Sequence, residues 1–268
     1  KSETTQSIPK LIGGIDGLSG DIAYSFYSRV INKAHKVSSA EVAESAKLLE
    51  NIYRSVNIAL VNEMKLILEK LGVDIWEVVE AAATKPFGFQ AFYPGPGLGG
   101  HCIPIDPFYL TWKAKEVGMP TRFIELAGEV NQKMPYVVID KVASALNDDG
   151  KSMSGAKVLV VGVAYKPDVD DIRETPAVFI IEDMIERGAI VSYHDPHVPD
   201  FPKMRGHDVN LSSISLNPNA LTDFDAVLIV TNHASIDWDL IALNAPLVID
   251  TRNALANCND IRARLVKA

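Results

Sequence analysis

The 268-residue sequence has little cysteine, no long apolar run and no excess of positive charge. Its two cysteines, Cys102 and Cys258, exclude a disulfide framework and indicate a reducing compartment, which we expect to be the cytoplasm. No apolar run approaches the ~20 residues of a membrane-spanning helix, and no secretory signal opens the chain. The net charge of −8 argues against a nucleic acid or an anionic membrane as partner. An anionic small molecule is compatible with it, because a phosphate site needs only a few local donors.

The most informative segment that is present is 97–107, Gly-Leu-Gly-Gly-His-Cys-Ile-Pro-Ile-Asp-Pro. Glycine lets the backbone turn tightly and approach a ligand, and proline fixes φ. We therefore expect a rigid loop that presents Cys102, with Asp106 one helical turn further on. A thiol held in this way is a candidate nucleophile, and the alternative is a buried structural cysteine in a turn.

The first part of the chain reads as a β-α-β fragment, with strands expected at 8–14 and 34–37 around a helix at 21–31. A strand of this kind normally belongs to a larger sheet. Either the fragment packs on the rest of this chain, or an upstream domain is missing.

A single long helix is predicted over 39–70, where neither glycine nor proline occurs. Ser38 and Glu41 form a possible capping box at its start, and Gly72 ends it. Apolar residues recur every three to four positions along it. A rod of this length connects two domains or forms a subunit interface, and we expect a homodimer through this helix.

The remaining chain contains helices, a loop rich in Gly, Pro and aromatic residues at 85–100, and then apolar strands that alternate with helical segments. The expected helices cover 74–83, 107–117, 121–146 and 175–187; the expected strands cover 158–161, 190–193, 226–231 and 247–250. This alternation predicts an α/β fold with an open parallel sheet and helices on both faces. Ligands of such sheets bind at the carboxyl ends of the strands, which here are followed by residues 162–166, 194–195, 231–233 and 250–252.

Several weaker constellations remain open from the residues alone. The full dinucleotide fingerprint G-x-G-x-x-G is absent. Lys166 and Arg173 are either phosphate donors or surface partners of nearby acidic residues. Lys47 and Asn51, four apart on the long helix, either support an oxyanion near the cysteine loop or form an exposed pair beside glutamates.

Two histidine patterns are weak indications of a site. His194 and His197 are interrupted by proline and lack further ligands at a usual spacing, so we predict no metal site. His101 is next to Cys102, where a general base is not expected to face its own neighbour, so a cysteine hydrolase is disfavoured. We interpret Cys258 as incidental.

Taken together, three segments resemble the nucleotide-sugar 6-dehydrogenase family over essentially the whole chain. They are residues 43–51 (Ala-Glu-Ser-Ala-Lys-Leu-Leu-Glu-Asn), the cysteine loop 97–107, and residues 165–176 (Tyr-Lys-Pro-Asp-Val-Asp-Asp-Ile-Arg-Glu-Thr-Pro). With a histidine directly before the cysteine, the loop is most similar to that of the branch that oxidises UDP-N-acetyl sugars. The expected substrate is UDP-GlcNAc. UDP-ManNAc and UDP-glucose are the alternatives.

The resemblance implies that NAD⁺ oxidises the C6 alcohol of a UDP-sugar to a carboxylate in two steps, through a thiohemiacetal and a thioester on Cys102. It also implies roles for other residues. Lys47, Asn51 and Asp106 would be catalytic; Arg173 would bind the cofactor; and Lys85, Phe92, Tyr93, Gly95, Gly99, Lys166 and Arg252 would bind the substrate.

The resemblance further implies three regions: a remnant of an N-terminal NAD-binding Rossmann domain (1–37), a central helical dimerisation domain (38–150) and a Rossmann-like UDP-sugar domain (151–268). Family members begin with a complete NAD-binding domain, whose glycine fingerprint and catalytic Thr and Glu are not found here. We therefore expect these residues alone to bind NAD poorly and to be inactive. The alternative to an enzyme is a UDP-binding and oligomerisation fragment.

Overall fold

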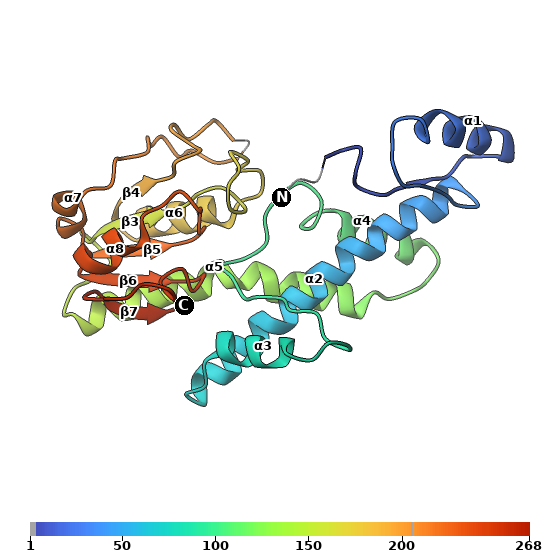
Figure 1. The fold of residues 1–268 in the computed structure, drawn as a ribbon. Helices are drawn as coiled ribbons and strands as arrows, with labels where there is room; N and C mark the ends of the chain where they lie inside the picture. Colours follow the sequence, from blue (N-terminus) through green and yellow to red (C-terminus); the bar gives the residue numbers. More distant parts are fainter. Residues whose placement is uncertain (1–3, 205) are drawn as a thin grey trace. The chain divides into compact units, whose positions relative to one another are not determined.

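The computed structural model describes residues 4–204 and 206–268, and the chain divides into two compact parts, residues 1–54 and 55–268 (Figure 1). In the first part, β1 (Lys10–Ile12) pairs in parallel with β2 (Ala34–Lys36), and α1 (Gly17–Tyr27) connects them. The β-α-β prediction is confirmed. The helix begins four residues earlier than expected because the Asp16 carboxylate accepts the Ser19 N–H at 2.7 Å and forms a capping box.

The long helix α2 (Ala40–Lys70) is continuous over 31 residues, as predicted. The hydroxyl of Ser39, rather than that of Ser38, accepts the Val42 N–H at 3.3 Å. The polar and apolar sides of this helix are unusual. Several of its exposed side chains are apolar, and several of its buried ones are polar: Val42, Leu49, Tyr53, Leu60 and Ile67 are exposed, and Ser55, Asn62 and Lys65 are buried.

Three further helices complete the helical region of the second part: α3 (Ile75–Ala83), α4 (Asp106–Glu116) and α5 (Arg122–Asp148). Asp74 caps α3 by accepting the Trp76 N–H at 2.9 Å, as its place before an apolar helix predicts. The segment between α3 and α4 has no regular secondary structure and carries the cysteine loop. None of the described helices is long and apolar enough to cross a membrane.

The rest of the second part is a five-stranded parallel sheet in the order β4-β3-β5-β6-β7. Its strands are β3 (Lys157–Val161), β4 (Ile190–His194), β5 (Ala226–Ile229), β6 (Leu247–Asp250) and β7 (Arg264–Lys267). Four of them were predicted. The edge strand β7 was missed because it has basic residues at both ends and only two apolar residues between them.

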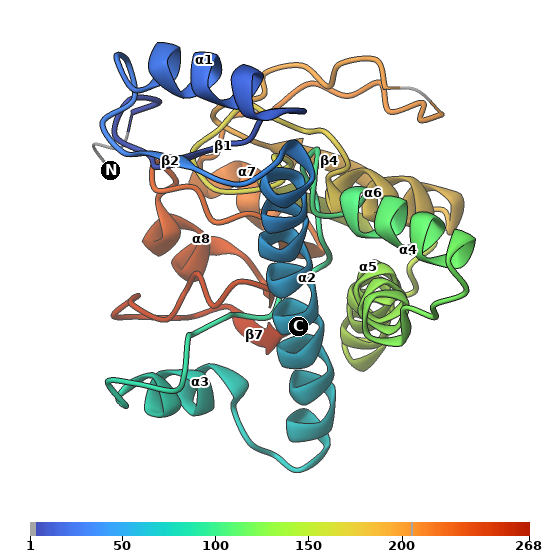
Figure 2. The same ribbon diagram turned by 90° about the vertical axis from the view of Figure 1, so that its right-hand side faces the viewer.

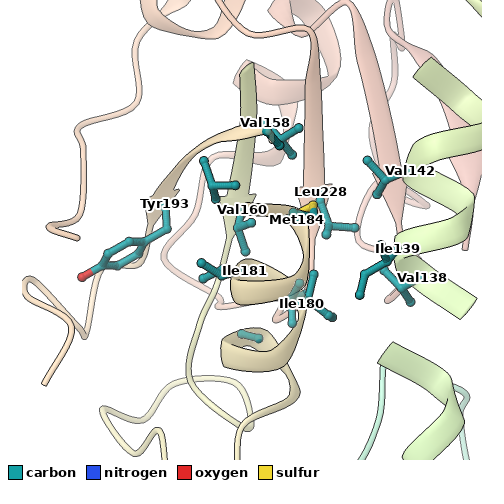
Figure 3. Packing of buried hydrophobic residues seen from close by; sticks show 14 of the residues in the cluster. Val138, Ile139, Val142, Val158, Val160, Ile180, Ile181, Met184, Tyr193 and Leu228 are labelled. Carbon is teal, nitrogen blue, oxygen red and sulfur yellow. The ribbon is translucent and has the colours of Figure 1, made fainter. Parts of the chain in front are cut away.

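Helices cover both faces of this sheet, which confirms the predicted α/β class. On one face α5 and α6 (Pro176–Glu186) pack on alternate strand residues, a cluster that includes the side chains labelled in Figure 3. On the other face α7 (Pro218–Thr222) and α8 (Trp238–Asn244) cover the intervening strand residues (Figure 2). Strands buried on both sides explain the continuous apolar runs in the sequence.

Candidate functional site

The cysteine loop is a tight turn that leads directly into α4. The carbonyl of Cys102 accepts the N–H groups of Ile105 at 3.2 Å and Asp106 at 2.8 Å, and Asp106 is the first residue of the helix. Cys102 is half-buried, and its Sγ lies 3.8 Å from Nδ1 of His101. The thiol is therefore not completely buried, and the neighbouring imidazole lies within reach of it, contrary to our expectation.

Two adjacent glycines seat this loop against the segment that follows β3. The Gly100 N–H donates to the carbonyl of Arg173 at 2.8 Å, and Gly100 has a φ of +89°. A Cβ on Gly100 would lie 2.9 Å from the Tyr165 ring, and one on Gly99 would lie 2.6 Å from the Tyr165 Cβ. Only residues without a side chain permit this approach. The structure thus brings together two segments that lie more than 60 residues apart in the sequence.

Arg173 and Lys166 project from the segment that receives the loop, and both are exposed. The Arg173 guanidinium pairs with Asp171 through Nε–Oδ1 at 3.0 Å and Nη2–Oδ2 at 2.6 Å. This hydrogen-bonded pair raises the pKa of Arg173, and the nearby Tyr165 and Cys102 raise it further by smaller amounts. The Lys166 ammonium lies 5.2 Å from the centre of the Tyr165 ring. For Arg173, the predicted salt bridge with a local aspartate therefore exists, and its charge still lies near the thiol.

Two cavities adjoin the cysteine loop. One of about 390 Å³ is mostly apolar and is lined by residues 103–105, by α5 and by the start of α6. The other, of about 310 Å³, is lined by His101, Arg173 and Lys203 together with Glu174 and His207. The second is therefore rich in cationic and titratable side chains, which suits an anionic group.

The carboxyl ends of the strands lie together at one edge of the sheet, as predicted. Asp195 is at the centre of the hydrogen bonds there. The buried Asp195 Oδ2 accepts the N–H groups of Val163 at 2.7 Å and Ala164 at 3.2 Å, and it lies 3.0 Å from Nε2 of His233. Burial alone would raise the pKa of Asp195, but hydrogen bonds from His233 and from the amides of Val163 and His197 lower it to about 2. A carboxylate therefore holds the turn after β3 in place.

His233 is occupied on both sides of its ring. Its Nδ1 accepts the Asp168 N–H at 3.0 Å, and Nε2 is then the protonated nitrogen that donates to Asp195. Potential ligand atoms of Asp168, His197 and His233 lie within 4.8 Å of one another. Because the free lone pair of His233 is already used, this group fits a structural hydrogen-bond network better than a metal site.

At the end of β6, Arg252 is held by two hydrogen bonds. Its N–H donates to Asp250 Oδ1 at 2.9 Å and its Nε donates to the carbonyl of Val230 at 2.9 Å. Burial lowers the pKa of Arg252 to about 10, while Asp250 opposes this shift, so the guanidinium stays charged at neutral pH. Gly95 packs directly on it: a Cβ there would lie 2.3 Å from Nη1.

Asn62 also lies beside Gly95, and it was not among the site residues predicted from the sequence. It is fully buried in α2, and its Oδ1 accepts the Gly95 N–H at 3.0 Å. The only signal in the sequence was an amide on a helix whose neighbouring positions are largely apolar. Tyr93, two residues before Gly95, stacks on Trp76 of α3 with ring centres 5.4 Å apart.

The other predicted site residues are less closely tied to this arrangement. Lys85 is exposed after the end of α3, and Phe92 is half-buried in the loop that follows. Lys47 and Asn51 belong to the first part of the chain. Lys47 is exposed with its ammonium 3.7 Å from Glu50, and Asn51 is buried. Their approach to Cys102 stays a prediction.

The sequence matches two profiles of one protein family. Residues 41–133 match the central domain of the UDP-glucose/GDP-mannose dehydrogenase family, and residues 159–257 match the UDP-binding domain of that family. The first match contains the cysteine loop, and the second contains the sheet edge described above.

Individual relatives agree with these matches. The UDP-N-acetyl-D-mannosamine dehydrogenase of Methanococcus vannielii is 34% identical over 254 residues, which are 92% of this chain and 56% of that protein. The UDP-N-acetyl-D-glucosamine 6-dehydrogenase of Pseudomonas aeruginosa is 32% identical over 235 residues, 87% of this chain and 54% of that protein.

A solved structure shows the same fold. The UDP-D-ManNAc dehydrogenase from Pyrococcus horikoshii aligns with a TM-score of 0.81 and 28% identity, over 97% of this chain and 60% of that one. The chain thus spans little more than half the length of the relatives that it matches. Because both profiles fall on the segments that form the cysteine loop and the sheet edge, the chain belongs to the UDP-glucose/GDP-mannose dehydrogenase family.

Proposed function

We propose that this chain carries the nucleophile and the UDP-sugar-binding part of an NAD-dependent UDP-N-acetylhexosamine 6-dehydrogenase. The observation that carries the proposal is the seating of the Cys102 loop, through Gly99 and Gly100, on the segment that bears Lys166 and Arg173. It holds a partly exposed thiol near the Arg173 guanidinium, at the carboxyl ends of parallel strands, where ligands of such sheets bind.

The reaction oxidises a C6 alcohol to a carboxylate by four electrons. When bound, NAD⁺ would supply the hydride acceptor for each of the two oxidations. Between them the Cys102 sulfur adds to the carbon of the aldehyde, and the aldehyde oxygen takes up a proton to give a thiohemiacetal. Loss of a hydride and a proton then gives a thioester on Cys102, and water cleaves its C–S bond to release the carboxylate and the thiol.

The remaining residues would support these steps. Lys47 would stabilise negative charge on the C6 oxygen, and Asn51 and Asp106 would hold water and move protons. Lys85, Phe92, Tyr93, Gly95, Gly99, Lys166 and Arg252 would bind the UDP-sugar.

Arg173 is the cofactor residue in this proposal. An exposed guanidinium that shares a pocket with Lys203 suits the phosphates of a dinucleotide. The turn after β3, Gly162-Val163-Ala164, has no glycine fingerprint, so the sheet described here suits the UDP-sugar rather than the dinucleotide.

Replacement of the nucleophile tests the proposal. In the complete enzyme, Cys102→Ser should still form the aldehyde, trapped with a hydrazine, but should produce no uronate above about a thousandth of the normal rate. Cys258→Ser is the matched control and should keep full uronate production. Undiminished uronate formation by the Cys102 variant would show that the thiol is not the nucleophile.

The sugar is proposed to be UDP-GlcNAc, and UDP-ManNAc and UDP-glucose are alternatives. Relatives with similar identity are named for different N-acetylhexosamines, which supports the class of substrate more strongly than the epimer. Rates of NAD⁺ reduction with the three sugars, compared at equal concentration, identify the substrate.

A second candidate is a UDP-binding and oligomerisation module without catalysis. The two profile matches, which cover a central domain and a UDP-binding domain, favour it for these 268 residues taken alone. Titration calorimetry of the chain with UDP and, separately, with NAD⁺ distinguishes the two candidates. Binding of UDP without binding of NAD⁺ or turnover supports the module.

We propose a homodimer as well, formed through α2. The exposed apolar residues of this helix recur at intervals of seven and four and therefore lie along one line: Val42, Leu49, Tyr53, Leu60 and Ile67. An apolar line of this kind is unfavourable in water unless another surface covers it.

A further inference from the structure

The buried face of α2 contains one of a pair of amides that are hydrogen-bonded to each other. Asn62 Nδ2 donates to Asn131 Oδ1 at 3.0 Å, and Asn131 Nδ2 donates to the carbonyl of Ser55 at 3.1 Å. Asn62 is 0% exposed and Asn131 is 4% exposed. Burial of two amides is costly unless their groups are hydrogen-bonded, and apolar residues would fill the same space more simply. The pair therefore invites a role beyond packing.

The remaining acceptor of this pair is used by a special backbone group. Asn62 Oδ1 accepts the Gly95 N–H at 3.0 Å. Gly95 is flanked by Pro94 and Pro96, which have no N–H, so its amide is the only backbone donor among these three residues. All three are buried. Residues 94–96 are called the strap below. Asn62 therefore accepts the one hydrogen bond that the backbone of the strap can donate.

The strap also lies directly against the guanidinium of Arg252. The Gly95 Cα is so close that a Cβ would lie 2.3 Å from Nη1 and 2.9 Å from Cζ of the guanidinium. The guanidinium also donates from Nε to the carbonyl of Val230, the residue directly after β5, at 2.9 Å. The position of the Arg252 side chain therefore depends on where Gly95 lies, and the hydrogen bond from Gly95 to Asn62 fixes the place of Gly95.

We infer that Asn62 is a positioning residue for nucleotide binding: it holds Gly95 on the guanidinium of Arg252 and so fixes the cation that receives the UDP part of the ligand. The inference rests on the proposed function, in which Gly95 and Arg252 bind the UDP-sugar. A side chain in α2 thereby acts at the carboxyl end of the sheet through one backbone hydrogen bond.

The first test is UDP binding by titration calorimetry on the 268-residue chain. Asn62→Leu keeps the branched shape but leaves the Gly95 N–H without its acceptor, and the Kd for UDP should rise about tenfold, the equivalent of one buried hydrogen bond. Asn131→Leu is the matched control. It removes the other half of the pair, keeps the bond to Gly95, and should lose stability while its Kd stays within about twofold.

The route through Arg252 gives a second, independent readout. In an Arg252→Ala background, Asn62→Leu should weaken UDP binding no further, because residues that act through one another are not additive. Hydrogen exchange of the Gly95 amide should also be faster in Asn62→Leu than in the wild type. If Asn62 only stabilised the fold, Asn62→Leu would leave the Kd for UDP of the folded chain unchanged.

The outcomes separate this inference from the proposed function. If the wild-type chain does not bind UDP, the UDP-binding role in the proposed function is wrong. If it does bind and folded Asn62→Leu binds equally well, the positioning role is wrong. Should Asn62→Leu not fold, Asn62→Asp replaces it: a carboxylate oxygen can still accept from the Gly95 N–H, so near-normal UDP affinity at reduced stability supports the inference, and a tenfold or greater loss overturns it.

Discussion

Nε2 of His233 lies 3.0 Å from Oδ2 of Asp195, and both side chains are completely excluded from solvent. The two residues come from the ends of β5 and β4, and they are 38 positions apart in the sequence. Together with the Asp168 N–H, which donates to the other nitrogen of the ring, they tie the segment after β3 to its neighbours. This segment bears Lys166 and Arg173.

Removal of the imidazole should therefore be severe. His233→Phe leaves the buried Asp195 carboxylate with one donor fewer and the Asp168 N–H without an acceptor, and we expect a loss of about 3–5 kcal/mol in unfolding free energy, measured by urea denaturation. His197→Phe is the matched control, since Nε2 of His197 is buried without a partner among the described residues. It should change stability by less than about 1 kcal/mol. Equal losses in both variants would contradict the assigned network.

Lys65 should make stability depend on pH in the alkaline range. It is 5% exposed, its Nζ has no hydrogen-bond partner among the described residues, and burial, with a contribution from Lys141, lowers its pKa to about 8 while Asp250 opposes the shift. Because the unfolded chain holds this proton more tightly, the penalty is fully present below pH 8. It disappears as the pH rises toward about 10.4.

The expected size of the Lys65 effect is about 3 kcal/mol, from 1.36 kcal/mol for each pKa unit. Lys65→Met should be more stable than the wild type in urea denaturation at pH 7, and the difference should shrink by pH 9.5. Lys141→Met is a suitable comparison, because Lys141 is only half-buried and is paired with Glu69. A constant difference at both pH values would mean that Lys65 finds a compensating partner.

The seating of the cysteine loop predicts a difference between two glycines. Gly100 and Gly118 both have positive φ, +89° and +71°, but only Gly100 has atoms within 4 Å of the place where a Cβ would lie. Gly118→Ala should cost about 1 kcal/mol of backbone strain. Gly100→Ala should cost about 1–3 kcal/mol more, because its Cβ meets the Tyr165 ring. Thermal denaturation of the two variants measures this, and equal costs would mean that the loop is not seated as described.

The apolar line on α2 predicts a change of assembly. Leu60→Glu places a charge in the middle of the proposed dimer interface and should convert a dimer to monomers in sedimentation equilibrium at micromolar concentration. Val117→Glu adds the same charge at another exposed apolar residue, after α4, and should leave the dimer intact. A wild-type chain that is monomeric at all concentrations would contradict the proposed interface.

Much of the fold followed from local rules. The spacing of apolar residues and the absence of glycine and proline predicted α2, Asp74 predicted the start of α3, and continuous apolar runs predicted four strands of the sheet. Each of these signals depends on residues only a few positions apart. The misplaced start of α1 and the missed β7 show the limit, because a cap and an edge strand leave weak patterns.

The sequence by itself determined the parallel sheet, the long helix and a turned loop that carries Cys102, because backbone conformation and burial are encoded in short-range patterns. Only the tertiary structure decided which segments meet: Gly100 with Tyr165, Gly95 with Arg252 and Asn62, and His233 with Asp195. These contacts join residues far apart in the chain, and each depends on the exact approach of two backbones. No local pattern of residue types carries that information.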